Sequence, residues 1–360
     1  MKIKATKQVS SSTRSNFITI GAIILIYFIF QMMIANGAMS NLLKGLLIPL
    51  CYYSILAVSL NLTVGILGEL SLGHAGFMCI GAFTSAFFSK VTENTITNPW
   101  VRFPIAILIG ALAAALLGIL IGMVVLRLRG DYLAIVTLAF GEIIKNVINV
   151  LFIGIDHNGI HFSMKDAAAL NLEEGGQTIV NGPRGITGTP KDATFGIAVL
   201  LLLLTYVIII NLVNSRSGRA IMAIRDNRIA AESMGIPITK FKILAFTISA
   251  SLAGVAGVLY SHNISTLIAT QKNFGYNMSI MILVFVVLGG IGNLQGSIIA
   301  AVVLTLLPEY LRFLQDYRMI IYAIVLIIIM IYNWNPKCIA WRKNHSIQGF
   351  LARLLKKEEA

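Results

Sequence analysis

Four polar side chains repeat along one face of a predicted helix, in the middle of an apolar run. Glu142, Lys145, Asn146 and Asn149 are spaced at i, i+3, i+4 and i+7, so they form one stripe. A charged side chain at the centre of a membrane helix costs about 2.5–3.5 kcal/mol on insertion scales. Glu142 and Lys145 can neutralise each other, in the order that favours a helical ion pair. The stripe must therefore face protein or water rather than lipid.

The density of polar groups in this stripe bears on its role. Hydrogen bonds between helices inside a membrane average well under about 2 kcal/mol each. Static association of helices does not require four polar groups that include two charges. We therefore favour a stripe that lines or gates a path for a solute, with static interhelical packing as the alternative.

A cluster of glycines between residues 65 and 81 surrounds three further candidate path residues, Glu69, Ser71 and His74. Glycine allows helices to approach closely, or a segment to unwind around a cavity. We expect His74 to be a hydrogen-bonded packing residue rather than a ligand contact. A similar cluster lies near residue 290. The glycines expected to pack helices or to unwind are Gly68, Gly73, Gly76, Gly289, Gly290 and Gly292.

Several kinds of chemistry are not expected of this chain. It has no Gly-x-x-x-x-Gly-Lys-Ser/Thr sequence, so we expect no ATP-binding loop of its own. His157 and His161 have helical i+4 spacing, but no third ligand is evident, so we expect no metal site. No nucleophile with a base and no paired catalytic carboxylates stand out, so we do not expect an enzyme.

The composition is that of a membrane protein. The sequence is 57% hydrophobic and only 12% charged, with a mean hydropathy of +0.83, whereas about a quarter of the residues in soluble domains are charged. The net charge of +13 does not indicate a nucleic-acid partner, because the basic residues flank apolar runs instead of gathering on one polar face. We attribute it to membrane orientation and to attraction by anionic lipid.

Near-continuous apolar runs of about 18 residues predict membrane-spanning helices, and we expect an all-α polytopic bundle of about ten spans. An even number places both termini on one side, and the basic clusters place that side in the cytoplasm. The membrane domain then covers 17–335, between cytoplasmic tails at 1–16 and 336–360. The expected spans are 17–35, 45–64, 74–89, 103–126, 131–153, 194–213, 243–262, 279–293, 297–313 and 318–334.

Two polar segments outside the spans have features of their own. The external connection 154–192 contains few basic residues and a run of turn-forming residues at 181–190, and it is either a solvated connector or a docking surface. In the C-terminal tail, a predicted helix has one apolar face beside basic residues, which suits a helix lying on the inner leaflet. That face comprises Ile347, Phe350, Leu351, Leu354 and Leu355.

The basic connection 214–242 is expected in the cytoplasm. Apolar residues alternate with arginines, so we expect one or two short amphipathic helices. These end where Gly235 accepts a left-handed cap and Pro237 prevents continuation. Ala230 and Ala231 provide a small-residue surface around which the groove of a partner can close. A solvated helical connector is the alternative.

The Ala-Ala-x-x-x-Gly pattern at 230–235 resembles the coupling loop of ABC importer permeases, although Ile229 stands where the general pattern has Glu. Three longer segments are similar to the branched-chain amino acid permeases, specifically to the longer of their two types. They are LNLTVGILGELSLGHAGFMCIGAF (60–83), LRLRGDYLAIVTLAFGEIIKNVI (126–148) and GRAIMAIRDNRIAAESMGI (218–236). NGPRGITG and VLGGIGNLQG (287–296) fit the same family, and the resemblance extends from about residue 45 to 335.

The resemblance implies a permease subunit of a binding-protein-dependent ABC importer in the bacterial inner membrane. Such an importer would move Leu, Ile and Val into the cell by ATP-driven alternating access. The implied partners are two ATP-binding cassette subunits that bind ATP and Mg²⁺, an external substrate-binding protein, and a second permease. The residues expected to contact the ATPase are Arg225, Asp226, Ala230, Ala231, Glu232 and Gly235.

Three alternatives stay open at this level. Related permeases import urea or short amides, and no residue in the sequence identifies the solute. The second permease is either another copy of this chain or a different, shorter chain, and the family favours the latter. An ion-coupled secondary carrier that uses Glu142 as its ion site is a further hypothesis.

Overall fold

The computed structural model describes residues 6–311 except 129, 158 and 174, together with scattered positions between 317 and 331. The predicted helix at 347–355 and most of the predicted span 318–334 lie outside the described residues. Residues 1–302 form one compact unit and residues 303–360 form another. The arrangement described below is that of the first unit.

The chain folds as a helical membrane bundle, as predicted, but the part of the chain that the structure describes contains fewer than ten spans. Among the described residues, seven helices are long and apolar enough to cross a membrane. They correspond to α1 (Thr6–Ala35), α2 (Asn41–Asn61) with its continuation η1 (Leu62–Leu67), α4 (Pro99–Val125), α5 (Asp131–Val150), α6 (Phe195–Asn214), α9 (Ile238–Ser261), and α10 (Gln271–Phe274) with α11 (Tyr276–Gly289).

Two predicted spans form helices that are not both long and apolar enough to cross a membrane. The helix α3 (His74–Val91) follows a non-helical segment and carries polar residues at both ends, including His74 and Lys90. The helix α12 (Leu294–Tyr310) is apolar but short. The predicted span at 279–293 begins too late, because the helical stretch already starts at Gln271 and breaks at Gly275.

Local sequence signals account for where several helices begin. Ser40, Asn98 and Thr194 each accept a hydrogen bond from a backbone N–H in the first turn of α2, α4 and α6. Pro99 directly follows its cap residue, where the missing N–H of proline leaves no donor unsatisfied.

The centre of the bundle is built from α2, α3, α4 and α9, with α2 mostly buried. Small residues set the helix spacing there. A Cβ added at Gly81 would collide with the backbone of Gly254, and one at Gly257 would collide with the carbonyl of Met78. Such close backbone approach is typical of helix packing inside membranes.

The second span is not a regular α-helix to its end. After Asn61 the chain continues as the π-helix η1 and stops at Gly68, whose φ of 79° is left-handed. Residues 69–73 are not helical, and α3 begins at His74. Backbone of this kind is tolerated in a membrane domain where it is buried in protein or lines a water-filled space.

The segment 152–187, which the sequence predicts to be external and which is called here the external subdomain, folds in a way that the sequence did not predict. Strands β1 (Phe152–Asp156), β2 (Gly159–Ser163) and β3 (Gln177–Asn181) make an antiparallel sheet in the order β2-β1-β3. The 3-10 turn η2 (Ala168–Leu170) lies between β2 and β3, and the 3-10 turn η3 (Gly182–Arg184) follows β3. Strand β4 (Ile186–Thr187) then pairs with β5 (Thr266–Leu267), which joins the segment to the connection between α9 and α10.

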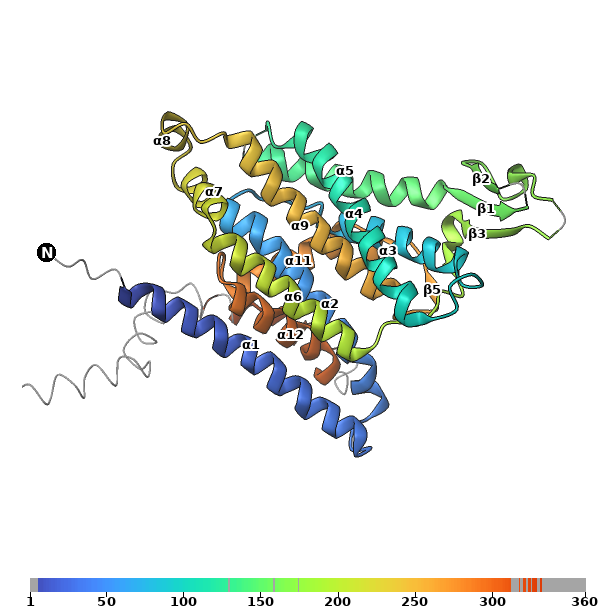
Figure 1. Ribbon diagram of the computed structural model, residues 1–360, viewed down its shortest axis with the longest axis horizontal. Helices are drawn as coiled ribbons and strands as arrows, with labels where there is room; N and C mark the ends of the chain where they lie inside the picture. Colours follow the sequence, from blue (N-terminus) through green and yellow to red (C-terminus); the bar gives the residue numbers. More distant parts are fainter. Residues whose placement is uncertain are drawn as a thin grey trace, which may run out of the picture. The chain divides into compact units, whose positions relative to one another are not determined.

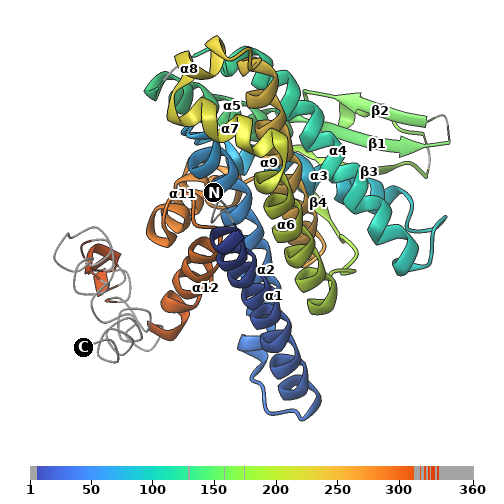
Figure 2. The ribbon, with the colours of Figure 1, turned by 60° about the vertical axis from the view of Figure 1, so that its left-hand side comes forward.

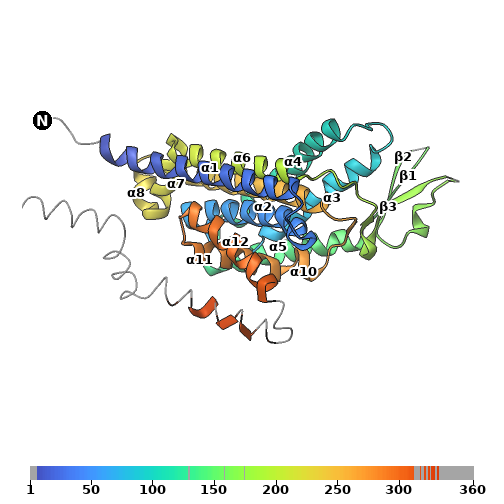
Figure 3. The ribbon, with the colours of Figure 1, turned by 90° about the horizontal axis from the view of Figure 1, so that it is seen from below.

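The sheet lies at the end of the bundle opposite to α7 (Arg216–Asp226) and α8 (Arg228–Ser233), as Figures 1 and 3 both show. Figure 2 shows α7 and α8 lying across the end at which α9 begins. The helix α1 runs alongside α6 (Figure 3). The two polar segments of interest in the sequence therefore occupy opposite ends of the bundle.

Candidate functional site

The polar stripe of α5 forms a hydrogen-bonded network with the broken helix α10–α11. Lys145 Nζ lies 2.6 Å from Glu142 Oε2 and also donates to Gln271 Oε1. Glu142 Oε1 accepts from Gln271 Nε2 at 3.0 Å and from the backbone N–H of Tyr276 at 2.7 Å. One carboxylate thus receives an ammonium group, an amide and the first N–H of α11.

One side of this network is exposed at the surface of the chain. An ion pair with a purely structural role could be fully buried. The side chain of Lys145 is 9% exposed, but that of Glu142 is 23% exposed. Asn146, Tyr276 and Asn277 beside it are exposed. Polar groups at this depth cannot face lipid. The face formed by α5 and α10–α11, called here the path face, must meet water or another protein chain.

The remaining stripe residue, Asn149, contacts the same connection further toward the sheet. Its Nδ2 donates to the carbonyl oxygen of Ala269 at 2.9 Å. Because β5 ends two residues earlier, at Leu267, this bond ties α5 to the strand that pairs with the external segment. The external subdomain and the path face are thus physically connected.

The three candidates around the first glycine cluster do not join the path face. His74 is buried, and its Nε2 lies 2.7 Å from Ser59 Oγ on α2, which agrees with a packing role. Ser71 is buried, and its hydroxyl has no hydrogen-bond partner among the described residues. Glu69 forms an ion pair with Lys242 in the first turns of α9. None of the three hydrogen-bonds to the polar stripe within the part of the chain that the structure describes; His74 joins α3 to α2, and Glu69 joins the segment 69–73 to α9.

Glycines of the first cluster pack the non-helical segment 69–73 and α3 against α5. A Cβ at Gly73 would collide with the carbonyl of Thr137, and one at Gly76 would lie 2.8 Å from the Cα of Gly141. Thr137 Oγ1 also accepts from the N–H of Leu72 at 3.0 Å. Gly141 directly precedes Glu142, so this packing positions the stripe.

Glycines of the second cluster make comparable approaches. Gly289 packs against the backbone of Gly296, and Gly290 and Gly292 have left-handed φ values of 97° and 82°. The N–H of Gly292 donates to Asn61 Oδ1 at 2.9 Å, next to Gly65. The two glycine clusters therefore meet where α2 passes into η1.

The connection 214–242 forms the two helices α7 and α8, as predicted. The tip carries exposed apolar side chains, since Ile229 and Met234 are each 81% exposed. Ala230, Glu232 and Gly235 are also exposed. Ala231 instead packs inward with Ile224 and Ile238. Ala231 thus holds α8 on the bundle, whereas its neighbours form an outward apolar surface, the α8 tip.

Arg225 anchors α7 to the end of η1. Its Nη1 donates to the carbonyl oxygen of Gly65 at 3.0 Å, and its Nε and Nη2 both bond to Asp226 Oδ1. Its Cγ would lie 2.6 Å from a Cβ added at Gly68. Asp226 thus orients Arg225, and Arg225 connects α7 to η1, which directly precedes the non-helical segment 69–73.

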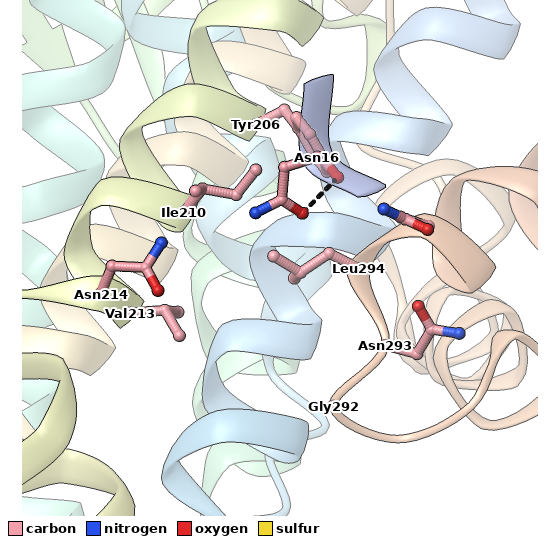
Figure 4. A pocket seen from close by; sticks show the side chains of 9 residues that line it. Asn16, Tyr206, Ile210, Val213, Asn214, Gly292, Asn293 and Leu294 are labelled. Carbon is pink, nitrogen blue, oxygen red and sulfur yellow. Dashed lines mark hydrogen bonds between the residues drawn. The ribbon is translucent and has the colours of Figure 1, made fainter. Parts of the chain in front are cut away.

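A polar pocket of about 310 Å³ opens at the same end of the bundle (Figure 4). Asn16, Tyr206 and Asn214 line it from α1 and α6, and the Tyr206 hydroxyl donates to Asn16 Oδ1 at 3.5 Å. Gly292 and Asn293 line it from the second glycine cluster. None of the stripe residues contributes, so this pocket is separate from the path face.

Two residues of these networks were not identified from the sequence. Gln271 lies 126 positions from Lys145, and Lys242 lies 173 positions from Glu69. Gln271 did carry a signal, because a polar run ending in Gly275 directly precedes an apolar run. Lys242 was counted only as part of a basic connection, and nothing local indicated its acidic partner.

The chain is similar to permeases of ABC-type importers over most of its length. The family model described as branched-chain amino acid transport system / permease component matches residues 42–330. The high-affinity branched-chain amino acid transport system permease protein LivM of Salmonella typhimurium is 33% identical over 91% of this chain and 76% of its own length. LivM of Escherichia coli is 36% identical over 79% of this chain and 67% of its own length.

A more distant relative is named for a different solute. The fructose import permease protein FruG of Bifidobacterium longum is 24% identical over 85% of this chain and 86% of its own length. No solved structure matches the chain.

Proposed function

This chain belongs to the family of branched-chain amino acid transport permease components, and we propose that it is a membrane-spanning subunit of a binding-protein-dependent importer driven by ATP. Its substrates would be Leu, Ile and Val, with urea or short amides as the alternative. The observation that carries this proposal is the apolar α8 tip, which projects from a membrane bundle and is tied to η1 through Arg225.

The α8 tip fits the role of a coupling surface for an ATPase subunit. Ile229 and Met234 are large apolar side chains held in water unless a partner covers them. Arg225, Asp226 and Gly235 fix the two helices that present them, and Ala230 and Glu232 complete the surface. We assign this surface to a groove on one of two ATP-binding cassette subunits, which would bind ATP and Mg²⁺.

Support for a translocation path comes from the path face. Its polar residues need water or a second chain, and a solute path between two permease subunits supplies both. The second permease would be a different, shorter chain. Glu142, Lys145, Asn146 and Asn149 would then line the path, whereas Glu69, Ser71 and His74 would support it from behind.

The external subdomain offers a docking surface for a substrate-binding protein. It is folded rather than a loose connector, and β4 pairs with β5 next to the segment that leads to Gln271. Docking on this subdomain would thus act close to the path face. The chain would lie in the inner membrane of a bacterium with both termini in the cytoplasm, and its basic C-terminal tail would contact membrane lipid.

The test is ATP-dependent uptake by the complete importer in proteoliposomes. Leucine should accumulate only when binding protein outside and ATP inside are both present. Accumulation by this chain and its partner permease alone, driven by an ion gradient without ATP, would instead identify an ion-coupled carrier. Uptake of urea without uptake of leucine would correct the substrate.

A matched pair of variants tests the coupling surface. Met234→Ser removes an apolar side chain from the α8 tip, and Met164→Ser removes an exposed one, 67% exposed, at the opposite end. Because both side chains are exposed, neither substitution should disturb folding. We expect Met234→Ser to weaken co-purification of the ATPase subunits and Met164→Ser to leave it unchanged. Equal co-purification would contradict the assignment.

A further inference from the structure

The path face contains a ready-made binding site for a carboxylate. Three donors converge on Glu142, namely Lys145 Nζ at 2.6 Å, Gln271 Nε2 at 3.0 Å and the backbone N–H of Tyr276 at 2.7 Å. The last of these opens the 14-residue helix α11, whose N-terminus attracts negative charge. In this structure the carboxylate of Glu142 occupies the site itself.

We propose that Glu142 and Lys145 bind the charged head of an amino acid as it passes the path face. The substrate carboxylate takes the donors of Lys145 and Tyr276, and the substrate ammonium group takes the carboxylate of Glu142. This inference rests on the proposed import function and names the chemical group that the path recognises.

Charge balance supports this occupant. The pair of Glu142 and Lys145 is neutral as a whole, and a zwitterion adds one positive and one negative charge. Every charge can therefore keep an opposite partner while the substrate is bound. A cation or an anion alone would leave one charge without a partner in a site of low polarity, which is strongly unfavourable.

The same groups discriminate against uncharged solutes. A sugar or urea carries no charge, so in its hydrogen bonds to Lys145 or Glu142 only one partner would be ionised, and these bonds would compete with the existing ion pair. Relatives of this chain are named for solutes as different as branched-chain amino acids and fructose. The charged pair therefore favours an amino acid over a sugar or urea as the substrate of this chain.

Partial exposure of Glu142 gives the substrate access. Its side chain is 23% exposed, whereas that of Lys145 is 9% exposed behind it. Asn146, one turn along α5, is exposed on the same face. A thiol placed at Asn146 would therefore report on both water access and substrate occupancy.

The test uses Asn146→Cys with Cys338→Ser, in the assembled importer in lipid nanodiscs. Cys51 and Cys79 are buried and serve as silent background. The rate of labelling by a charged, membrane-impermeant thiol reagent is measured with leucine, with leucinamide, which lacks the carboxylate, and with 4-methylpentanoate, which lacks the ammonium group. We expect leucine alone to slow labelling, and this protection to be lost in Glu142→Gln and in Lys145→Met.

A matched control is the pair Lys90 and Glu93, which has the same i,i+3 spacing at 2.8 Å but lies at the far end of α3. Lys90→Met should leave protection by leucine unchanged. Equal protection by all three compounds, or none by leucine while labelling still occurs, overturns the inference but leaves a water-lined path. No labelling under any nucleotide condition overturns the path face and the inference together.

Discussion

Two Glu–Lys ion pairs in this bundle differ in what they join and in how exposed they are. Glu142 and Lys145 lie on one helix, three residues apart, and their pair opens onto the path face. Glu69 and Lys242 lie 173 residues apart, with side chains only 16% and 6% exposed, and their pair joins the non-helical segment to the first turns of α9. In our proposal, the pair of Glu142 and Lys145 exchanges partners with a solute. The pair of Glu69 and Lys242 instead joins two segments of the bundle.

A series of packed contacts runs from α7, past the segment that carries Glu69, to the helix α5 that carries Glu142 and Lys145. Arg225 on α7 bonds to Gly65, the segment 69–73 follows, and Gly73 and Gly76 pack against Thr137 and Gly141 of α5. Movement of the α8 tip would therefore reach α5 through closely packed backbone. Spatial continuity alone does not establish coupling, and the variants below separate the two pairs by function.

The largest effect is expected from Lys242→Met. Removing one partner of a buried ion pair costs about 3–5 kcal/mol, because the other charge stays buried without compensation. We expect the loss of stimulated ATPase activity and of leucine uptake together, with a lower thermal unfolding midpoint. The double variant Lys242→Met with Glu69→Gln should recover part of the stability. A double variant as unstable as the sum of its single variants would contradict a direct pair.

Glu142→Gln should have the next largest effect and a different pattern. It removes charge-assisted hydrogen bonds worth about 1.5–3 kcal/mol, which corresponds to a roughly ten- to hundredfold loss of uptake rate. Because the substitution is isosteric and Lys145 keeps its hydrogen bond to Gln271, the loss of thermal stability should be clearly smaller than that of Lys242→Met. Uptake assays and unfolding curves on the same preparation check this. If thermal stability fell as strongly as uptake, the pair of Glu142 and Lys145 would have a structural role instead of a role in binding the solute.

Gly68→Ala should have an intermediate effect on stability. Its φ of 79° costs an alanine about 1–2 kcal/mol, and the new Cβ would also press on the side chain of Arg225. Gly37→Ala has a similar φ of 68° and nothing within 4 Å, so it carries the backbone penalty alone. The difference in unfolding midpoint measures the contact with Arg225. Equal midpoints would show that Arg225 moves aside freely.

Lys90→Met should have the smallest effect. Its side chain and that of Glu93 are 29% and 41% exposed, and such pairs contribute about 0.2–1 kcal/mol. Uptake and stimulated ATPase activity should remain within experimental scatter of the parent importer. A large loss of uptake would mean that ion-pair spacing alone, rather than position on the path face, determines the effect.

The sequence predicted features that depend on local spacing. Glu142, Lys145, Asn146 and Asn149 share a face because helical periodicity requires it, and Glu142 and Lys145 pair as expected. The two short helices ending near Gly235 also follow from local signals, since glycine accepts the left-handed φ of 78° found there. The family resemblance quoted from motif segments is confirmed by the match over residues 42–330.

The features that the sequence did not predict depend on contacts between distant segments. The external sheet has strands of only five residues each. Strand β4, which follows that sheet, pairs with β5 about 80 residues later along the chain, far outside the window of about 11–18 residues in which periodicity is read. The break at Gly275 and the π-helix η1 shift span ends because glycine and tertiary packing override apolar length. These contacts make Gln271 and Lys242 part of the two networks.

The central claim is tested most directly by measuring ATP hydrolysed and leucine accumulated in the same vesicles, for Glu142→Gln and Glu69→Gln. For Glu142→Gln, we predict near-normal stimulation of ATP hydrolysis by loaded binding protein with little accumulated leucine. Glu69→Gln should lose both together, because its pair with Lys242 connects the coupling end to the bundle. If both variants lose hydrolysis and uptake in the same proportion, the two pairs have one role and the account is wrong.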